Sequence, residues 1–232
     1  MKIFFLVLLA AAVLIPGIAF GGSFGIGPEA DLDFFGNSQL QWSVVKGSST
    51  ATYALFGKQS VSLSPGLTFF YIFDKNVILG GTALYRNFPG EFQVPDNKPN
   101  LPVNFEEEAL IFRVGYIDFY RDRTWHFSDF DAPVLPAFPF GHFRLGIYRS
   151  DISGSKDFKQ FQPAYAGSLG IEMGAIFMPA EKFYFTLSGL VDYTFTVVPY
   201  KAHIAGVSHE ILNNVLLFGI SFQLGFLSDT PE

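Results

Sequence analysis

The sequence predicts an all-β protein, an antiparallel up-and-down transmembrane β-barrel of eight strands that follows a cleaved signal peptide. Three observations lead to this fold class. Large apolar side chains alternate with small or polar ones along many segments, which is the two-residue period of a strand with two different faces. Charged residues make up only 16 % of the 232 residues, whereas aromatic residues make up 18 %. The connections between the segments alternate between short and long, as in outer-membrane barrels.

The first 21 residues have the layout of a secretory signal peptide. Lys2 supplies a positive charge, an apolar run extends from Ile3 to Ile15, and a Pro-Gly break with small residues follows. The run is shorter than the ~20 residues that a helix needs to span a bilayer, which argues against a transmembrane anchor. We therefore expect export, a barrel over residues 22–226 and a short tail over residues 227–232.

The composition excludes several classes of function. The chain has no cysteine, so disulfides and thiolate metal sites are absent. The net charge of −6 gives no electrostatic footprint for nucleic acid. The sequence shows no cofactor motif, and the histidines have no metal-ligand spacing; they are His126, His142, His203 and His209. Export without disulfides is typical of a bacterial envelope protein, and we expect the outer membrane.

Eight segments carry the two-residue period, and several reach the ~9–11 residues of a membrane-spanning strand. They are residues 23–35, 60–73, 77–88, 105–119, 140–149, 164–177, 183–195 and 214–226. Short turns are expected at 74–76 and 179–182, and long connections at 36–58, 88–104, 120–139, 150–162 and 198–211. If the chain starts in the periplasm, all long connections except 120–139 lie outside the cell.

Two of the long connections leave the number of strands open. The segment 120–139 is either a periplasmic excursion or a further hairpin. The segment 36–58 contains two apolar stretches around KGSS, which form either an external hairpin or an extra pair of spanning strands. Eight strands are therefore expected, with ten or twelve as alternatives.

The kind of polar residue indicates which face points outward. A water-facing surface is rich in charge, but the non-apolar face here consists mainly of Gly, Ser and Thr. Small side chains suit the interior of a narrow barrel, and large apolar ones suit lipid. A soluble barrel with an apolar interior is the alternative.

Isolated charges fall on the inward face and predict a charge network in the lumen. Buried charges must be paired, and arginines can bind the carboxylates. The network is either an ion path or gate, or a salt-bridged plug; an eight-stranded barrel is just filled by side chains, which favours the plug. The expected members are Glu29, Asp31, Asp33, Arg86, Arg113, Arg144, Glu172 and Asp192.

The final segment LFGISFQLGF resembles the closing strand of small outer-membrane β-barrel proteins of Gram-negative bacteria, of the OmpA, OmpX and OmpW type. The resemblance implies an assembly signal at Phe222, Leu224 and Phe226 that the barrel assembly machinery recognises. It also implies contact with outer-membrane lipid and lipopolysaccharide. In this chain LSDTPE follows the aromatic residue, whereas the family commonly ends there.

The sequence alone permits three functions. The first is a non-enzymatic barrel that acts through its external loops in binding, structure or envelope integrity, and the second is a narrow channel for small or apolar solutes. The third is a lipid-modifying enzyme, for which Ser208, His209 and Glu210 are the local candidates, with His203 nearby. Adjacent side chains on a strand point to opposite faces, so these three cannot form a triad by themselves. Polar residues at a strand entrance are the simpler interpretation.

Overall fold

The computed structural model describes residues 23–46, 48–55, 57–59, 61–73, 76–92, 101–118, 137–180 and 182–228. The predicted signal peptide, most of segment 120–139 and the last four residues lie outside these ranges. The eight predicted strands are all confirmed. They are β1 (Ser23–Lys46), β4 (Ser62–Phe73), β5 (Val77–Phe92), β6 (Leu101–Ile117), β7 (Ala137–Ser153), β8 (Ala164–Ala180), β9 (Phe183–Val198) and β11 (Val207–Leu227).

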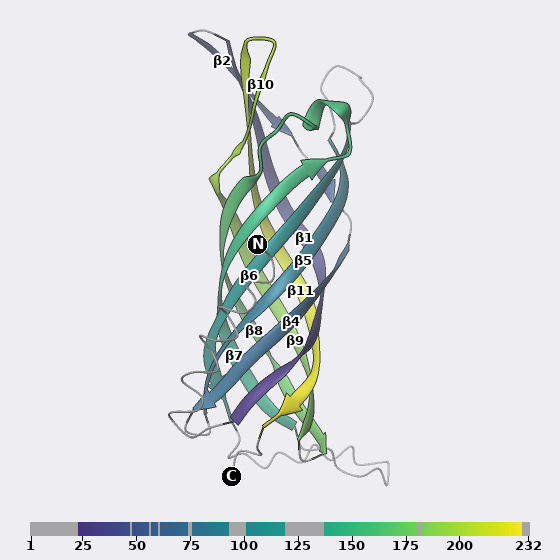
Figure 1. Cartoon of the computed structure of the whole chain (residues 1–232), viewed down its shortest axis with the longest axis vertical. Coiled ribbons are helices and arrows are strands. Elements are labelled where there is room, and N and C mark those ends of the chain that lie inside the picture. The colour runs from purple at the N-terminus through teal and green to yellow at the C-terminus, as the bar shows by residue number, and fades with distance from the viewer. Residues whose placement is uncertain are drawn as a thin grey trace.

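These strands form one closed ring (Figure 1). Each pairs antiparallel with its neighbours in the order β1, β4, β5, β6, β7, β8, β9, β11, and β11 pairs with β1. β11 ends at Leu227, one residue beyond the predicted end of the barrel. We call the end where the short turns lie the lower rim. Both ends of the described chain meet there, because Ser228 N–H donates to the carbonyl of Phe24 over 2.8 Å. The opposite end is the upper rim.

The long connections at the upper rim are shorter than predicted, since β5, β7 and β11 extend into residues 88–104, 150–162 and 198–211 and continue the barrel wall. β1 runs to Lys46 and forms a hairpin with β2 (Ser49–Leu55), and β11 forms another with β10 (Tyr200–Ile204). β1 and β11 also pair with each other up to Val45 and Ser208. The order β2, β1, β11, β10 is thus a four-stranded sheet above the barrel, which we call the upper extension. The segment 36–58 is therefore an external hairpin rather than a pair of spanning strands.

Two short elements complete the upper rim. β3 (Gly57–Gln59) pairs with β5, which reaches to Phe92 instead of ending at residue 88. A single 3₁₀ turn, η1 (Lys156–Phe158), follows β7 and folds over the mouth of the barrel. No helix in the described ranges is long and apolar enough to cross a membrane.

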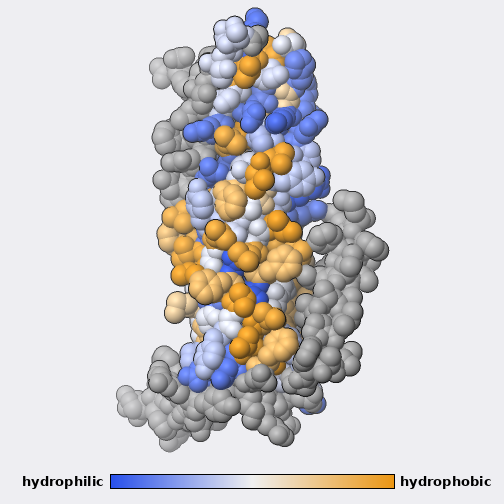
Figure 2. All heavy atoms as spheres, turned by 90° about the vertical axis from the view of Figure 1, so that its left-hand side faces the viewer, coloured by the Kyte–Doolittle hydropathy of each residue, from blue (hydrophilic) through white to orange (hydrophobic). Residues whose placement is uncertain are grey.

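The outer surface confirms the predicted direction of the apolar face. On β11, Ile220 is 46 % exposed while the next residue, Ser221, is 1 % exposed. Figure 2 shows hydrophobic side chains gathered over the lower half of the face that it draws, and hydrophilic ones above them. The apolar belt ends upward at a polar row in which Glu108 and Arg149 face outward, 3.7 Å apart, between Tyr85 and Tyr165 on the neighbouring strands.

The lumen is filled by layers of side chains. Next to the lower rim lies an apolar layer that includes Phe70, Ile72, Ile117 and Tyr184. Polar and charged residues fill the middle, and the upper layer, with Phe88, Phe105, Tyr200 and Ile211, is again apolar.

A bulge in β1 changes which residues face the lumen. The pairing with β11 shifts by one residue between Phe35 and Asn37. Below the shift, odd-numbered residues such as Asp33 point inward; above it, Trp42 is inward and packs on the upper apolar layer. A bulge inserts one unpaired residue and so reverses the alternation in the strand that carries it. A strictly periodic interpretation of the sequence therefore cannot place Trp42.

Candidate functional site: the lumen charge network

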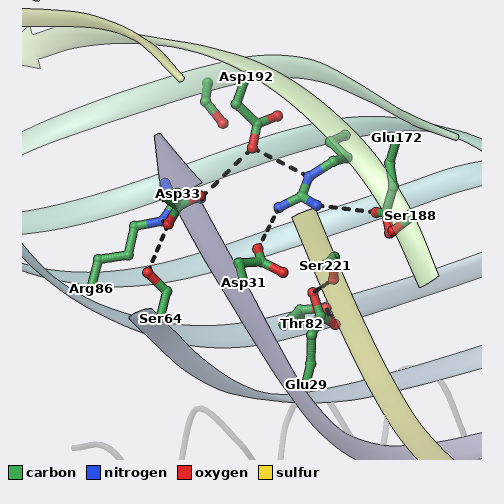
Figure 3. Close-up of polar contacts among 12 residues, drawn as sticks. Glu29, Asp31, Asp33, Ser64, Thr82, Arg86, Glu172, Ser188, Asp192 and Ser221 are labelled. Carbon is green, nitrogen blue, oxygen red and sulfur yellow. Dashed lines mark hydrogen bonds and ion pairs between the residues drawn. The ribbon is translucent and has the colours of Figure 1, made fainter. Parts of the chain in front are cut away.

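The structure brings all eight predicted lumen charges together in the middle of the barrel. Figure 3 shows Glu29, Asp31, Asp33, Arg86, Glu172 and Asp192 among them. Their side chains are at most 5 % exposed. The two signs come from different arcs of the wall: the arginines from β5, β6 and β7, and the carboxylates from β1, β8 and β9. Charges of opposite sign thus face each other across the lumen. The arginines are Arg86, Arg113 and Arg144, and the carboxylates are Glu29, Asp31, Asp33, Glu172 and Asp192.

Arg144 is the centre of the network. Its Nη2 lies 3.2 Å from Oδ2 of Asp31, its Nη1 lies 3.1 Å from Oε2 of Glu172, and its Nε lies 3.3 Å from Oδ2 of Asp192. One guanidinium thereby contacts three carboxylates from three strands. The planar fork of arginine permits this, because its donors point in several directions at once. Gly170 provides space here: a Cβ at that position would lie 1.7 Å from Asp192 Oδ1.

Arg86 continues the network toward the upper rim. Its Nε lies 3.2 Å from Oδ2 of Asp33, and its Nη2 lies 3.7 Å from Oδ2 of Asp192. The guanidinium also donates to the hydroxyl of Tyr148 over 3.1 Å. Ser64 donates to Asp33 over 2.7 Å, so this carboxylate binds both a cation and a neutral donor.

Arg113 forms the lower part of the network. Its Nη1 donates to Oε2 of Glu29 over 2.8 Å and its Nη2 contacts Oε1, which makes a bidentate pair. Its Nε lies 3.2 Å from Oε2 of Glu172. Hydroxyls of Thr82 and Ser221 also donate to Glu29, over 3.1 and 3.3 Å. The small polar residues of the inward face thus serve as hydrogen-bond donors to the carboxylates.

A second carboxyl site lies above the apolar belt. Glu107 is buried on β6 and accepts a hydrogen bond from Ser150 over 3.4 Å, and Ser150 in turn accepts one from Tyr200 over 2.6 Å. Glu107 is one of three consecutive glutamates, and burial alone distinguishes it from Glu106 and Glu108, so its place in the lumen was not predicted.

Aromatic rings close the mouth of the barrel. Phe158 of η1 is fully buried, and its ring lies 6.3 Å from Trp42 and 6.1 Å from Phe161. The indole N–H of Trp42 donates to Nδ1 of His209 over 3.2 Å. An indole N–H can only donate, so Nδ1 of His209 must be the unprotonated nitrogen in this arrangement. We call Trp42, Phe158, Phe161 and His209 the aromatic cap.

The candidate enzyme residues do not come together. Ser208 lies on the exposed side of the β10–β11 hairpin, where its hydroxyl is 3.2 Å from Nδ1 of His203. His209 points the other way, into the aromatic cap. Glu210 is paired across the hairpin with Lys201 rather than with either histidine. The expected alternation of adjacent side chains accounts for this separation.

The remaining candidates are placed as follows. Phe222 and Phe226 are 41 % and 63 % exposed on the outer face of β11. The two aromatic residues of the predicted assembly signal therefore lie on the surface, and the signal itself stays a prediction. Over the described part of the chain, no three His, Asp or Glu side chains converge to form a metal site.

The closed ring of eight antiparallel strands with a charged lumen is the fold of small outer-membrane β-barrels. No family model and no curated protein sequence matches the chain. Among solved structures, the chain is similar to the outer membrane protein OprG from Pseudomonas aeruginosa, with a TM-score of 0.60 at 13 % identity, over 90 % of this chain and 97 % of that one. It also matches AlkL (TM-score 0.46, 9 % identity, 92 % and 93 % coverage) and Ail of Yersinia pestis (0.38, 12 %, 86 % and 98 %). The predicted resemblance to small outer-membrane barrels thus holds at the level of the fold.

Proposed function

We propose that this protein is a non-conducting outer-membrane barrel that acts at the cell surface through its upper extension, in binding or in envelope integrity. One observation carries the proposal. Arg144 is bound by Glu172 of the adjacent β8 and by Asp192 and Asp31 of the more distant β9 and β1, so the ion pairs extend across the middle of the lumen. Apolar layers lie both below and above these ion pairs. In this proposal the ion pairs and the two apolar layers leave no continuous water-filled path for ions.

The length of the wall supports action at the surface. A tilted strand needs about 9–11 residues to cross a bilayer. β1 has 24 residues and β11 has 21, so about half of each strand lies outside the apolar belt. With the termini in the periplasm, the upper extension projects from the cell. In this proposal lipopolysaccharide and outer-membrane lipid surround the belt and the polar row above it.

Single-channel recording in planar bilayers tests the closed lumen. We expect no steady openings from the mature barrel. Arg144→Ala should introduce openings, because it removes the shared partner of three carboxylates. The control is Leu145→Ala, one residue away on the lipid face and 48 % exposed. Steady, reproducible openings of the unmodified protein would instead support the alternative, a narrow channel for small solutes.

Shortening the upper extension tests the surface role. Residues 43–52 can be replaced by the dipeptide Asn-Gly, because Trp42 and Tyr53 are already paired across the hairpin. Asn-Gly favours the two-residue turn that would then join the two strands. We expect the barrel to keep its heat-modifiable migration on a denaturing gel while cells become detergent-sensitive or binding of purified lipopolysaccharide falls. A shortened protein that behaves like the full one in both assays would contradict the proposal. Unchanged lipid A in mass spectra, with and without the protein, would argue against the enzymatic alternative.

A further inference from the structure

A small cavity lies at the lower edge of the lumen charge network. Arg113 and Glu172 border it on one side, and Phe70 and Ile176 of the lower apolar layer border it on the other. Its volume of about 10 Å³ is close to the space that one water molecule needs. The remaining lining residues are Thr68, Ile78, Phe140, His142, Thr186 and Gln223.

His142 is the unusual member of this lining. Its side chain is only 9 % exposed, and neither ring nitrogen has a hydrogen-bond partner among the described residues. A neutral imidazole carries one donor and one acceptor nitrogen, and buried groups of both kinds are nearly always satisfied. Gly115 on the neighbouring strand makes space for the ring, since a Cβ there would lie 2.4 Å from Cδ2 of His142. The wall therefore accommodates a polar ring in a place where its polar atoms lack protein partners.

Glu172 faces His142 directly, as the two residues are paired across β7 and β8. Nδ1 of His142 and Oε2 of Glu172 are 3.9 Å apart. This distance exceeds that of a direct hydrogen bond. A water molecule beside these two atoms could hydrogen-bond to both of them across this separation.

We propose that this cavity binds one ordered water molecule, held by His142 and Glu172. The water donates one O–H to the carboxylate of Glu172 and the other to the unprotonated ring nitrogen of His142. Thr186 and Gln223 line the cavity and offer further polar contacts, so the water has the two to four partners that buried waters have. The site completes the lower end of the charge network without a further charged residue. It does not depend on the role proposed for the upper extension.

Solid-state NMR of the full mature barrel in lipid bilayers tests the site. Magnetisation is transferred from water protons to ¹⁵N-labelled histidine rings and to ¹³C-labelled isoleucine. We expect early transfer to the ring nitrogens of His142 and none at the same time to Ile72, which is 1 % exposed in the lower apolar layer and does not line the cavity. If the His142 nitrogens receive as little magnetisation as Ile72, the cavity is dry and the proposal is overturned.

A substitution of His142 tests whether this side chain holds the water. In His142→Phe, the water signal at the Gln223 side chain should disappear, because the ring no longer offers a nitrogen. The control Phe143→Leu changes the next residue, which faces lipid and is 68 % exposed, and should leave the signal unchanged. Persistence of the Gln223 signal in His142→Phe would show that His142 does not hold the water. Should this variant fail to insert, the measurement on the unmodified barrel still decides.

Discussion

Arg144 on β7 reaches across the lumen to Asp31 on β1, with 3.2 Å between Nη2 and Oδ2. The two residues are 113 positions apart in the chain and lie on strands that share no ladder. Their contact therefore depends on a completed ring.

Removing Arg144 should strongly destabilise the inserted barrel. Arg144→Met leaves Asp31, Glu172 and Asp192 with less positive charge, and breaking a buried ion pair from one side costs about 3–5 kcal/mol. Urea unfolding in lipid vesicles measures the loss. Leu145→Met, on the lipid face, should change the free energy of unfolding by less than about 1.5 kcal/mol, the usual limit for an exchange of similar apolar volume. Equal losses in the two variants would argue against the network as a source of stability.

The orientation of β11 predicts opposite tolerances at neighbouring residues. Ile220→Arg places a charge in the apolar belt and should cost about 2–4 kcal/mol near the midplane. Ser221→Asn stays in the lumen beside Glu29, where its amide can replace the serine as a donor, and should be milder. The same pair of substitutions at Leu187 and Ser188 tests β9. Equal free energies of unfolding for the outward and inward variants would mean that the faces are assigned incorrectly.

The closing seam between β1 and β11 should not tolerate a side chain at Gly27. A Cβ there would lie 1.6 Å from the carbonyl oxygen of Leu224, so the two strands would have to move apart. We expect Gly27→Ala to reduce the fraction of folded, heat-modifiable barrel. Gly189→Ala on β9 is the control, since nothing lies within 4 Å of the added Cβ. A folded fraction for Gly27→Ala that matches this control would contradict the close packing of the seam.

The hydrogen bond between Trp42 and His209 gives an optical test of the aromatic cap. The chain has two tryptophans, so Trp125→Phe leaves Trp42 as the sole reporter. His209→Phe removes the acceptor, and we expect the emission spectrum of Trp42 to shift because its indole N–H loses this partner. His203→Phe changes a residue on the exposed side of the β10–β11 hairpin and should leave the spectrum unchanged. Equal shifts in the two variants would contradict the hydrogen bond within the aromatic cap.

The strands and the lumen charges were predictable because both depend on local alternation. Every second residue of a barrel strand faces the same side, either the lumen or the lipid. The position of Asp31 in the lumen and of Ile220 on the lipid face could therefore be predicted from the residues around each of them. Ion-pair partners were not predictable: that Arg144 meets Asp31 depends on the register of strands far apart in the chain. The bulge after Phe35 was also missed, because one inserted residue has no compositional signal and reverses the alternation that leads to Trp42.

The upper rim was underestimated for a different physical reason. Above the apolar belt the outer face of a strand contacts water instead of lipid and the inner face packs on the upper apolar layer, so the alternation no longer follows the pattern of the belt. Residues 41–46 and 200–204 are nevertheless strands, held by the ladder hydrogen bonds of their neighbours. Residues 200–204 were predicted as part of a loop, and residues 41–46 as part of either a hairpin or a spanning pair. Their conformation is set by pairing, which a single sequence does not display.

The placement of arginines and carboxylates on opposite arcs has a consequence for biogenesis. β1 is the first of these strands to leave the ribosome, and its three acids have no cationic counterpart until β5, β6 and β7 have arrived and the sheet has curled over. A chain interrupted before that point must keep its interior hydrated, since dehydrating bare carboxylates is prohibitively costly. Water can therefore leave the lumen only after all strands have assembled. Incomplete chains keep a hydrated interior, in which their backbone is accessible to periplasmic proteases.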